Sequence, residues 1–170
     1  MPEITICEFK PGDAADVSRI ICESFKDVFC GKLPEYFAPS HSPEKMIEMA
    51  LSKDPYEKRM ALVALSDGKV IGYARGTAHV CGLGSWETVA VDPDFRKGGV
   101  ASAFMERMLE FWRKSGTRKV STCVTASNTR AALFYFKHGF TVEGYRKDHF
   151  APGMDEIILA RFLWLYAQNT

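Results

Sequence analysis

The sequence predicts an α/β fold in which helices pack on one mixed β-sheet. Short segments with strand-like apolar patterns and longer segments with apolar residues at helical spacing follow one another in the order βααβββαβαββ. Such an order is typical of a mixed sheet with helices packed on it. No repeat, low-complexity tract or long linker interrupts the 170 residues, so we expect a single domain over 1–170.

The first part of the chain predicts one strand followed by two helices. Ile4–Phe9 alternates apolar and polar side chains, as a half-buried strand does. Asp13 can cap a helix whose apolar residues recur at helical spacing until Gly31. Ser42, followed by a proline and a glutamate, favours the start of a second helix that continues to Leu51.

Three strands are predicted in the middle of the chain. Met60–Leu65 and Val70–Gly76 flank a turn at 66–69 and together give a β-hairpin pattern. Residues 84–91 predict a further strand, which stops at Asp92.

The last part of the chain predicts two helices and three strands. A long helix follows Gly99, because its apolar residues form one stripe that ends near Ser115. The other predicted segments are a strand over 119–124, a helix over 128–138 and strands over 140–146 and 155–162.

The charge balance argues against a general polyanion binder. Lys and Arg together number 22 and Asp and Glu 21, which leaves a formal net charge of +1. Proteins that bind nucleic acid or anionic membranes normally carry a large basic excess. We therefore expect neither nucleic acid nor membrane as a partner.

Cysteine and histidine usage predicts no disulfide framework and no metal site. The five cysteines are odd in number and form no C-x-x-C pair, and the four histidines form no H-E-x-x-H motif. The N-terminus lacks a signal-peptide pattern, and the apolar runs are too short to span a bilayer. These features predict a cytoplasmic protein.

The most informative segment is 89–102, where a strand leads through a basic, glycine-bearing loop into the long helix. A helix N-terminus carries unpaired N–H groups and a partial positive charge, so it attracts anions. Gly98 and Gly99 allow close approach of a ligand, and Arg96 and Lys97 add positive charge. These residues predict a phosphate or pyrophosphate site, with a tight strand–helix turn and solvated charges as the alternative.

Two short motifs occur together in this sequence, Arg96-x-x-Gly99-x-Ala101 and the segment 127–140. Together they resemble the GNAT superfamily of acyl-CoA-dependent N-acetyltransferases. Arg96-x-x-Gly99-x-Ala101 matches the [QR]-x-x-G-x-[GA] signature of that family. Residues 127–140 are similar to its N-x-x-A-x-x-x-Y-x-x-x-G-F segment, and the two motifs occur in the family's order. The resemblance covers about 71–163.

The resemblance implies a GNAT-type fold, namely a mixed, mostly antiparallel seven-stranded sheet flanked by about four helices. It also implies acetyl-CoA as co-substrate, with no metal. The strand at Val89–Val91 would bind the pantetheine arm through its backbone, and the loop would hold the pyrophosphate. The implied coenzyme-binding residues are Val89, Val91, Arg96, Lys97, Gly98, Gly99, Val100, Ala101, Ser102, Asn128 and Tyr135.

Tyr135 and Asn128 have specific roles in this resemblance. Tyr135 falls on the family's tyrosine and would protonate the leaving thiolate, with a packed core tyrosine as the alternative. Asn128 falls on an asparagine that contacts pantetheine, and it can also serve as a helix N-cap.

Glu87 is the predicted general base. Strand alternation places it on the same face as Val89 and Val91, unless a β-bulge interrupts the strand. The alternative is a solvated strand residue. Cys123 stands where some relatives that acetylate protein N-termini carry a glutamate, so that base is absent, and a route through the Cys123 thiolate is not expected.

The predicted reaction moves an acetyl group from acetyl-CoA to a primary amine by direct attack in a ternary complex. The acceptor is expected to be a small-molecule amine or a protein N-terminal amine. A non-catalytic acyl-CoA-binding sensor on the same fold is the alternative. The apolar segment 162–166 either packs on the domain or forms a homodimer contact.

Overall fold

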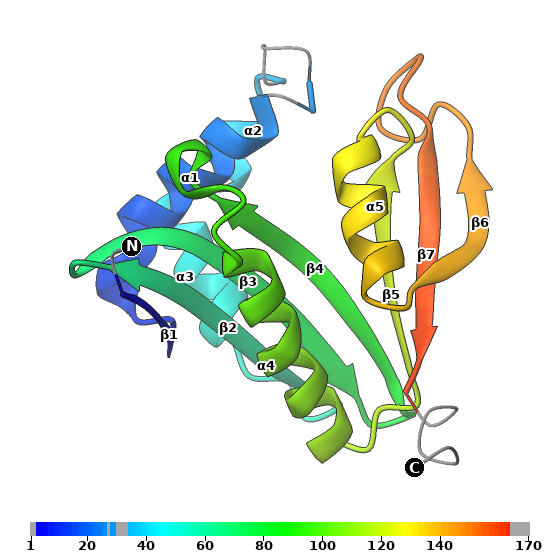
Figure 1. The fold of residues 1–170 in the computed structure, drawn as a ribbon, viewed down its shortest axis with the longest axis horizontal. Helices are drawn as coiled ribbons and strands as arrows, with labels where there is room; N and C mark the ends of the chain where they lie inside the picture. Colours follow the sequence, from blue (N-terminus) through cyan, green and yellow to red (C-terminus); the bar gives the residue numbers. More distant parts are fainter. Residues whose placement is uncertain (1–2, 27, 30–33, 164–170) are drawn as a thin grey trace.

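A seven-stranded sheet runs through the computed structural model, which describes residues 3–26, 28–29 and 34–163 (Figure 1). In spatial order the strands are β1-β2-β3-β4-β5-β7-β6, and only the β4–β5 pair is parallel among these neighbours. The predicted mixed, mostly antiparallel sheet is therefore confirmed. The strands are β1 (Ile4–Glu8), β2 (Glu57–Ser66), β3 (Lys69–His79), β4 (Leu83–Val91), β5 (Lys119–Thr125), β6 (Thr141–Arg146) and β7 (Glu156–Phe162).

The four predicted helices are present and begin where the sequence indicates. They are α1 (Ala14–Lys26), α3 (Pro43–Leu51), α4 (Val100–Lys114) and α5 (Thr129–Lys137). Ser42 caps α3, because its hydroxyl accepts a hydrogen bond from the Lys45 N–H. A short helix that the sequence did not indicate, α2 (Phe37–Ser40), precedes α3.

The helices cover the two faces of the sheet separately. One core cluster joins α1 and α3 to β2, β3 and β4 through residues such as Ile20, Met46 and Tyr73. The other cluster joins α4 and α5 to the opposite face, with Phe104 and Trp112 at its centre. In Figure 1, α4 and α5 lie in front of the sheet and α1 and α3 behind it.

The sheet opens between β4 and β5. The two strands pair over three residues each, Leu83–Ser85 with Lys119–Ser121, and then diverge (Figure 1). The hydroxyl of Thr122 donates to the carbonyl of Trp86 at 2.9 Å, directly beyond the last paired residues. We call the opening beyond this bond the β4–β5 splay.

Some predicted boundaries differ from the observed ones. β2 starts at Glu57 rather than at Met60, and β3 continues beyond Gly76 to His79. These strands pair with each other over the added residues, so their partner extends each of them beyond its own apolar pattern. The first helix, α1, ends at Lys26 rather than near Gly31, because residues 28–29 form a turn. Gly31 itself and most of the segment 162–166 lie outside the described residues. Among the described helices, none is long and apolar enough to cross a membrane.

Candidate active site

The loop between β4 and α4 has the backbone of an anion site. Gly99 is the N-cap of α4 with φ +83°, and it provides no side-chain cap. The first intrahelical bond runs from the Ala103 N–H to the Gly99 carbonyl at 3.0 Å. The N–H groups of 100–102 precede this bond, so they have no partner within the helix. Lys97 also has a left-handed backbone, with φ +68°, and it is exposed together with Gly98 and Gly99.

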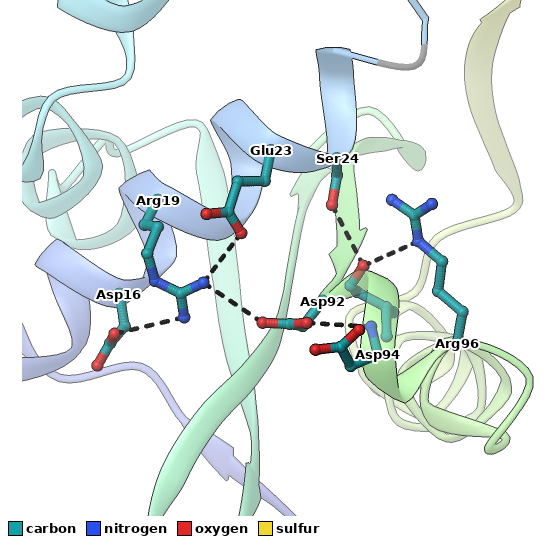
Figure 2. Close-up of polar contacts among 8 residues, drawn as sticks. Asp16, Arg19, Glu23, Ser24, Asp92, Asp94 and Arg96 are labelled. Atoms are coloured by element: carbon teal, nitrogen blue, oxygen red, sulfur yellow. Dashed lines mark hydrogen bonds and ion pairs between the residues drawn. The ribbon is translucent and has the colours of Figure 1, made fainter.

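Arg96 reaches back over the end of β4. Its Nε donates to the Val91 carbonyl at 3.3 Å, and the Ser24 hydroxyl donates to the same oxygen at 3.2 Å (Figure 2). Beside them, Arg19 of α1 bonds Asp92 at 3.3 Å and Glu23 at 2.9 Å. The loop therefore starts from a strand end that is fixed to α1.

The backbone of β4 faces the splay at Val89 and Val91. The Asp92 N–H bonds Ile71 of β3, so the residue before it points its polar groups to the other side of the strand. The Val91 carbonyl accordingly accepts from side chains rather than from β3. Val89, two residues earlier, faces the same way. Within the described part of the chain, β5 pairs with β4 only over Leu83–Ser85, which lies before both residues.

Tyr135 lies at the apex of the splay. It is 4% exposed, and its hydroxyl bonds Thr122, which in turn bonds the Trp86 carbonyl. Trp86 and Phe140 contact its ring edge-on at 6.2 and 5.3 Å between centroids. Burial raises the pKa of the Tyr135 hydroxyl above its usual value, so the group stays protonated near neutral pH. Tyr135 is thus packed in the core and has its hydroxyl at the splay.

Other predicted coenzyme residues have structural contacts of their own. Asn128 caps α5 by accepting from the Ala131 N–H at 3.2 Å. The Ser102 hydroxyl lies 3.2 Å from Nε2 of His138, which connects the first turn of α4 to the end of α5. The Val100 side chain is buried in the core, so only its backbone is available to a ligand.

A β-bulge changes the position of Glu87. Arg75 of β3 pairs with Thr88 of β4, and the next residue, Gly76, pairs with Trp86. Glu87 is therefore an extra residue of β4 without a partner on β3. Trp86 and Val89 then pack on the same side, so the expectation that Glu87 shares the face of Val89 is wrong. Glu87 instead pairs with Arg75, with 2.6 Å between Oε2 and Nε.

Glu87 and Arg75 line an open cavity of about 320 Å³ on the side of α3. Arg59 of β2 also reaches it, and Arg59 is held by Glu57 and by the Ser52 carbonyl. The remaining lining residues are Glu48, Met49 and Ser52. Sequence reasoning missed both arginines, because only the pairing of β2 with β3 brings them together.

Cys123 has a carboxylate as its neighbour. The Glu156 side chain of β7 contacts the thiol, and burial together with this carboxylate raises the pKa of Cys123 to about 11. Sequence reasoning also missed Glu156, which lies 33 residues further along the chain. Among the described residues, no cluster of His, Cys, Asp or Glu could hold a metal ion.

A mixed sheet that opens between two parallel strands, with an uncapped helix N-terminus at one end of the opening, defines the class as an acetyltransferase domain. The family model described as "Acetyltransferase (GNAT) family" matches residues 23–140. The chain belongs to this family, and the resemblance found in the sequence is confirmed.

Relatives in the family are named for different acceptor substrates. The L-amino acid N-acetyltransferase AaaT of Escherichia coli K12 is 28% identical over 159 residues, which cover 88% of this chain and 90% of AaaT. The ribosomal protein bS18-alanine N-acetyltransferase of the same strain is 25% identical over 114 residues, covering 66% and 76%.

A solved structure shares the fold. The PaiA N-acetyltransferase of Thermoplasma acidophilum, in complex with coenzyme A, superposes with a TM-score of 0.74 at 19% identity and covers 94% of this chain and 99% of its own.

Proposed function

We propose that this chain transfers the acetyl group of acetyl-CoA to a primary amine, by direct attack of the amine in a ternary complex. The observation that carries the proposal is the β4–β5 splay, which has backbone groups of Val89 and Val91 along one side and an uncapped helix N-terminus at its end. Acetyl-CoA supplies the acetyl group as a thioester. We further propose that 1–170 acts as one N-acetyltransferase domain in the cytoplasm.

The loop residues fit a pyrophosphate. The N–H groups of 97–102 would donate to its oxygens, and the left-handed backbone at Lys97 and Gly99 would turn them toward one point. Arg96 would contribute charge while its Nε holds the Val91 carbonyl. Because that carbonyl already accepts two bonds, the Val91 N–H is the group of this residue left for the pantetheine arm.

The apex of the splay fits the thioester end. A backbone N–H beside Val89 would donate to the thioester carbonyl oxygen as negative charge develops there. The Tyr135 hydroxyl would give a proton to the leaving sulfur, since its raised pKa keeps that proton in place. Asn128 would contact the pantetheine arm with the part of its amide that does not cap α5.

Direct transfer is favoured over an acetyl-cysteine route. A nucleophilic cysteine needs a thiolate, and thiolates form where nearby positive charge lowers the pKa. Cys123 has the opposite surroundings, because a carboxylate and burial raise its pKa to about 11.

The acceptor is proposed to be the α-amine of an amino acid, either free or at a protein N-terminus. Two relatives act on such amines according to their names, and they differ in whether the amine belongs to a protein. The cavity beside Glu87 carries charges of both signs, which suits an acceptor that has its own charged groups.

The test is a thiol-release assay with acetyl-CoA and a panel of L-amino acids, spermidine and a peptide with N-terminal alanine. Turnover with an α-amine is expected. Coenzyme A should also raise the melting temperature at saturation. A protein that coenzyme A does not stabilise would contradict the proposal. Stabilisation without turnover of any amine would favour the acyl-CoA sensor instead.

A further inference from the structure

Glu156 is a buried carboxylate whose ion-pair partners, Arg146 and His149, lie 3.5 Å from one of its oxygens. Its side chain is 1% exposed, and neither oxygen makes a hydrogen bond of good geometry within the described residues. The hydroxyl of Thr125, directly opposite on β5, is buried and lacks a hydrogen bond as well. A buried charge is costly unless it is well paired, so the long ion-pair contacts of Glu156 beside an unsatisfied hydroxyl single it out among the buried groups of β5 and β7.

The register places Glu156 beside the apex of the splay. Cys123 lies two residues beyond the last residue of β5 that pairs with β4, and so within the splay. Cys123 and Thr125 share a face, and Glu156 is paired with Thr125. This face is opposite to the one that Val124 and Leu159 bury against α5, and it is therefore the face on which Arg75 binds Glu87.

The two carboxylates on this face differ in their charge balance. Glu87 has the Arg75 guanidinium at 2.6 Å, which compensates its charge. Glu156 has Arg146 and His149 only at 3.5 Å from one oxygen, and both of these side chains are about half exposed. Asp155, next to Glu156 on β7, bonds Tyr145 and the Asp148 N–H. Of the carboxylates Glu87, Asp155 and Glu156, Glu156 therefore has the longest charged contacts.

Cys123 is the neighbour of Glu156 that reaches the surface of this face. Cys123 is exposed on this face although its sulfur contacts the buried carboxylate. A thiol is small and stays neutral here, so it neither repels an incoming ammonium group nor compensates the carboxylate. The groups that face Glu156 are thus Cys123 from β5, Arg146 from β6 and His149 from the turn after it.

We propose that Glu156 is the catalytic carboxylate that binds the acceptor ammonium group and accepts its proton. This inference rests on the proposed function. The ammonium gives one proton to Glu156, and the neutral amine forms the new N–C bond as the C–S bond of the thioester breaks. The leaving sulfur takes one proton to become the thiol. That proton comes from Tyr135, which is restored by the second proton that leaves the amine nitrogen, and Glu156 releases its own proton to solvent to reset the site.

The test compares Glu156→Gln with the unsubstituted protein, using the panel amine with the highest turnover, over pH 6–9. At pH 7 the substitution should lower kcat/KM roughly 100-fold. The difference in kcat/KM between the two proteins should become smaller as the pH approaches the pKa of the acceptor amine, because free amine then forms without a base. A purely structural role would give a loss that does not depend on pH.

Three further variants keep the test decisive. Glu143→Gln, an exposed glutamate on the adjacent β6, should stay within about twofold of the unsubstituted protein, as surface substitutions usually do. Glu156→Asp keeps the carboxylate and should retain the pH profile even if the Gln variant folds poorly. Glu87→Gln removes a charge from the proposed acceptor cavity, so it is compared only for the dependence of kcat/KM on pH, which should remain that of the unsubstituted protein.

The outcomes separate the two proposals. Equal activity of Glu156→Gln and the unsubstituted protein, or a pH-independent loss, would overturn this inference alone. A pH-dependent loss in Glu87→Gln instead would assign the proton to Glu87 and also overturn it. A protein that binds coenzyme A but acetylates no amine would overturn both the inference and the proposed function.

Discussion

The loop before α4 and the face of the sheet around Glu87 and Glu156 are built in different ways. The loop uses consecutive residues, and two of them, Lys97 and Gly99, have left-handed backbone angles. The face uses side chains from β3, β4, β5 and β7, which the sheet register brings together. A site made from backbone can be recognised in a short motif, whereas a site made from distant side chains depends on pairing that no motif contains.

The Tyr135 hydroxyl belongs to neither region, and its removal should have the largest effect among the following changes because it is the proposed proton donor. Tyr135→Phe keeps the ring packed against Trp86 and deletes the proposed proton donor. Turnover should fall about 10- to 100-fold, toward the low end for general acids because a thiolate leaves easily. Coenzyme A should still raise the melting temperature by the same amount. Unchanged turnover would remove Tyr135 from the mechanism.

A change at Gly99 tests whether the loop works through its backbone. Gly99→Ala adds a side chain at φ +83°, which costs about 1–2 kcal/mol where the backbone is left-handed. Coenzyme A binding, measured by titration calorimetry, should weaken roughly tenfold by the same strain.

Lys97→Gly is the matched control for this loop. The substitution removes a charged side chain, but it also removes the backbone strain of a non-glycine residue in the left-handed conformation. Affinity for coenzyme A should change less than about threefold, as expected for one exposed charge. A larger loss for Lys97→Gly than for Gly99→Ala would mean that side-chain charge, not backbone, holds the ligand.

The smallest effect is expected at Cys123. Cys123→Ala removes a thiol that is less than about 1% ionised at pH 7.5, given a pKa of about 11 and the usual titration behaviour. Turnover should stay within about twofold, and iodoacetamide should inactivate the protein only slowly at this pH. Loss of activity in the alanine variant would show that the thiol takes part in transfer.

Local patterns in the sequence were sufficient for most of the fold. Ser42 and Asn128 both cap the helices they were expected to start, since capping depends on a few neighbouring residues. The long helix after Gly99 follows from its apolar stripe. The short helix Phe37–Ser40 has too few residues for any periodicity and was missed.

The candidate site was predictable only on its coenzyme side. The loop and Tyr135 lie within two contiguous motifs. A β-bulge near Glu87 was considered but could not be located from the sequence, because it depends on how Trp86 and Thr88 pair with residues of β3. The contact of Glu156 with Cys123 depends on the pairing of β7 with β5. No local pattern in either strand indicates which strand it pairs with.

The open stretch of β4 has a consequence for the behaviour of the protein in storage and in the cell. Beyond Ser85 it is a strand edge in the middle of a sheet, and its polar backbone groups at Val89 and Val91 face no neighbouring strand among the described residues. Unpaired edges are templates on which other chains add strands and aggregate. A pantetheine arm bound along β4 would occupy the same hydrogen-bonding groups, so the co-substrate would also protect this edge from association with other chains.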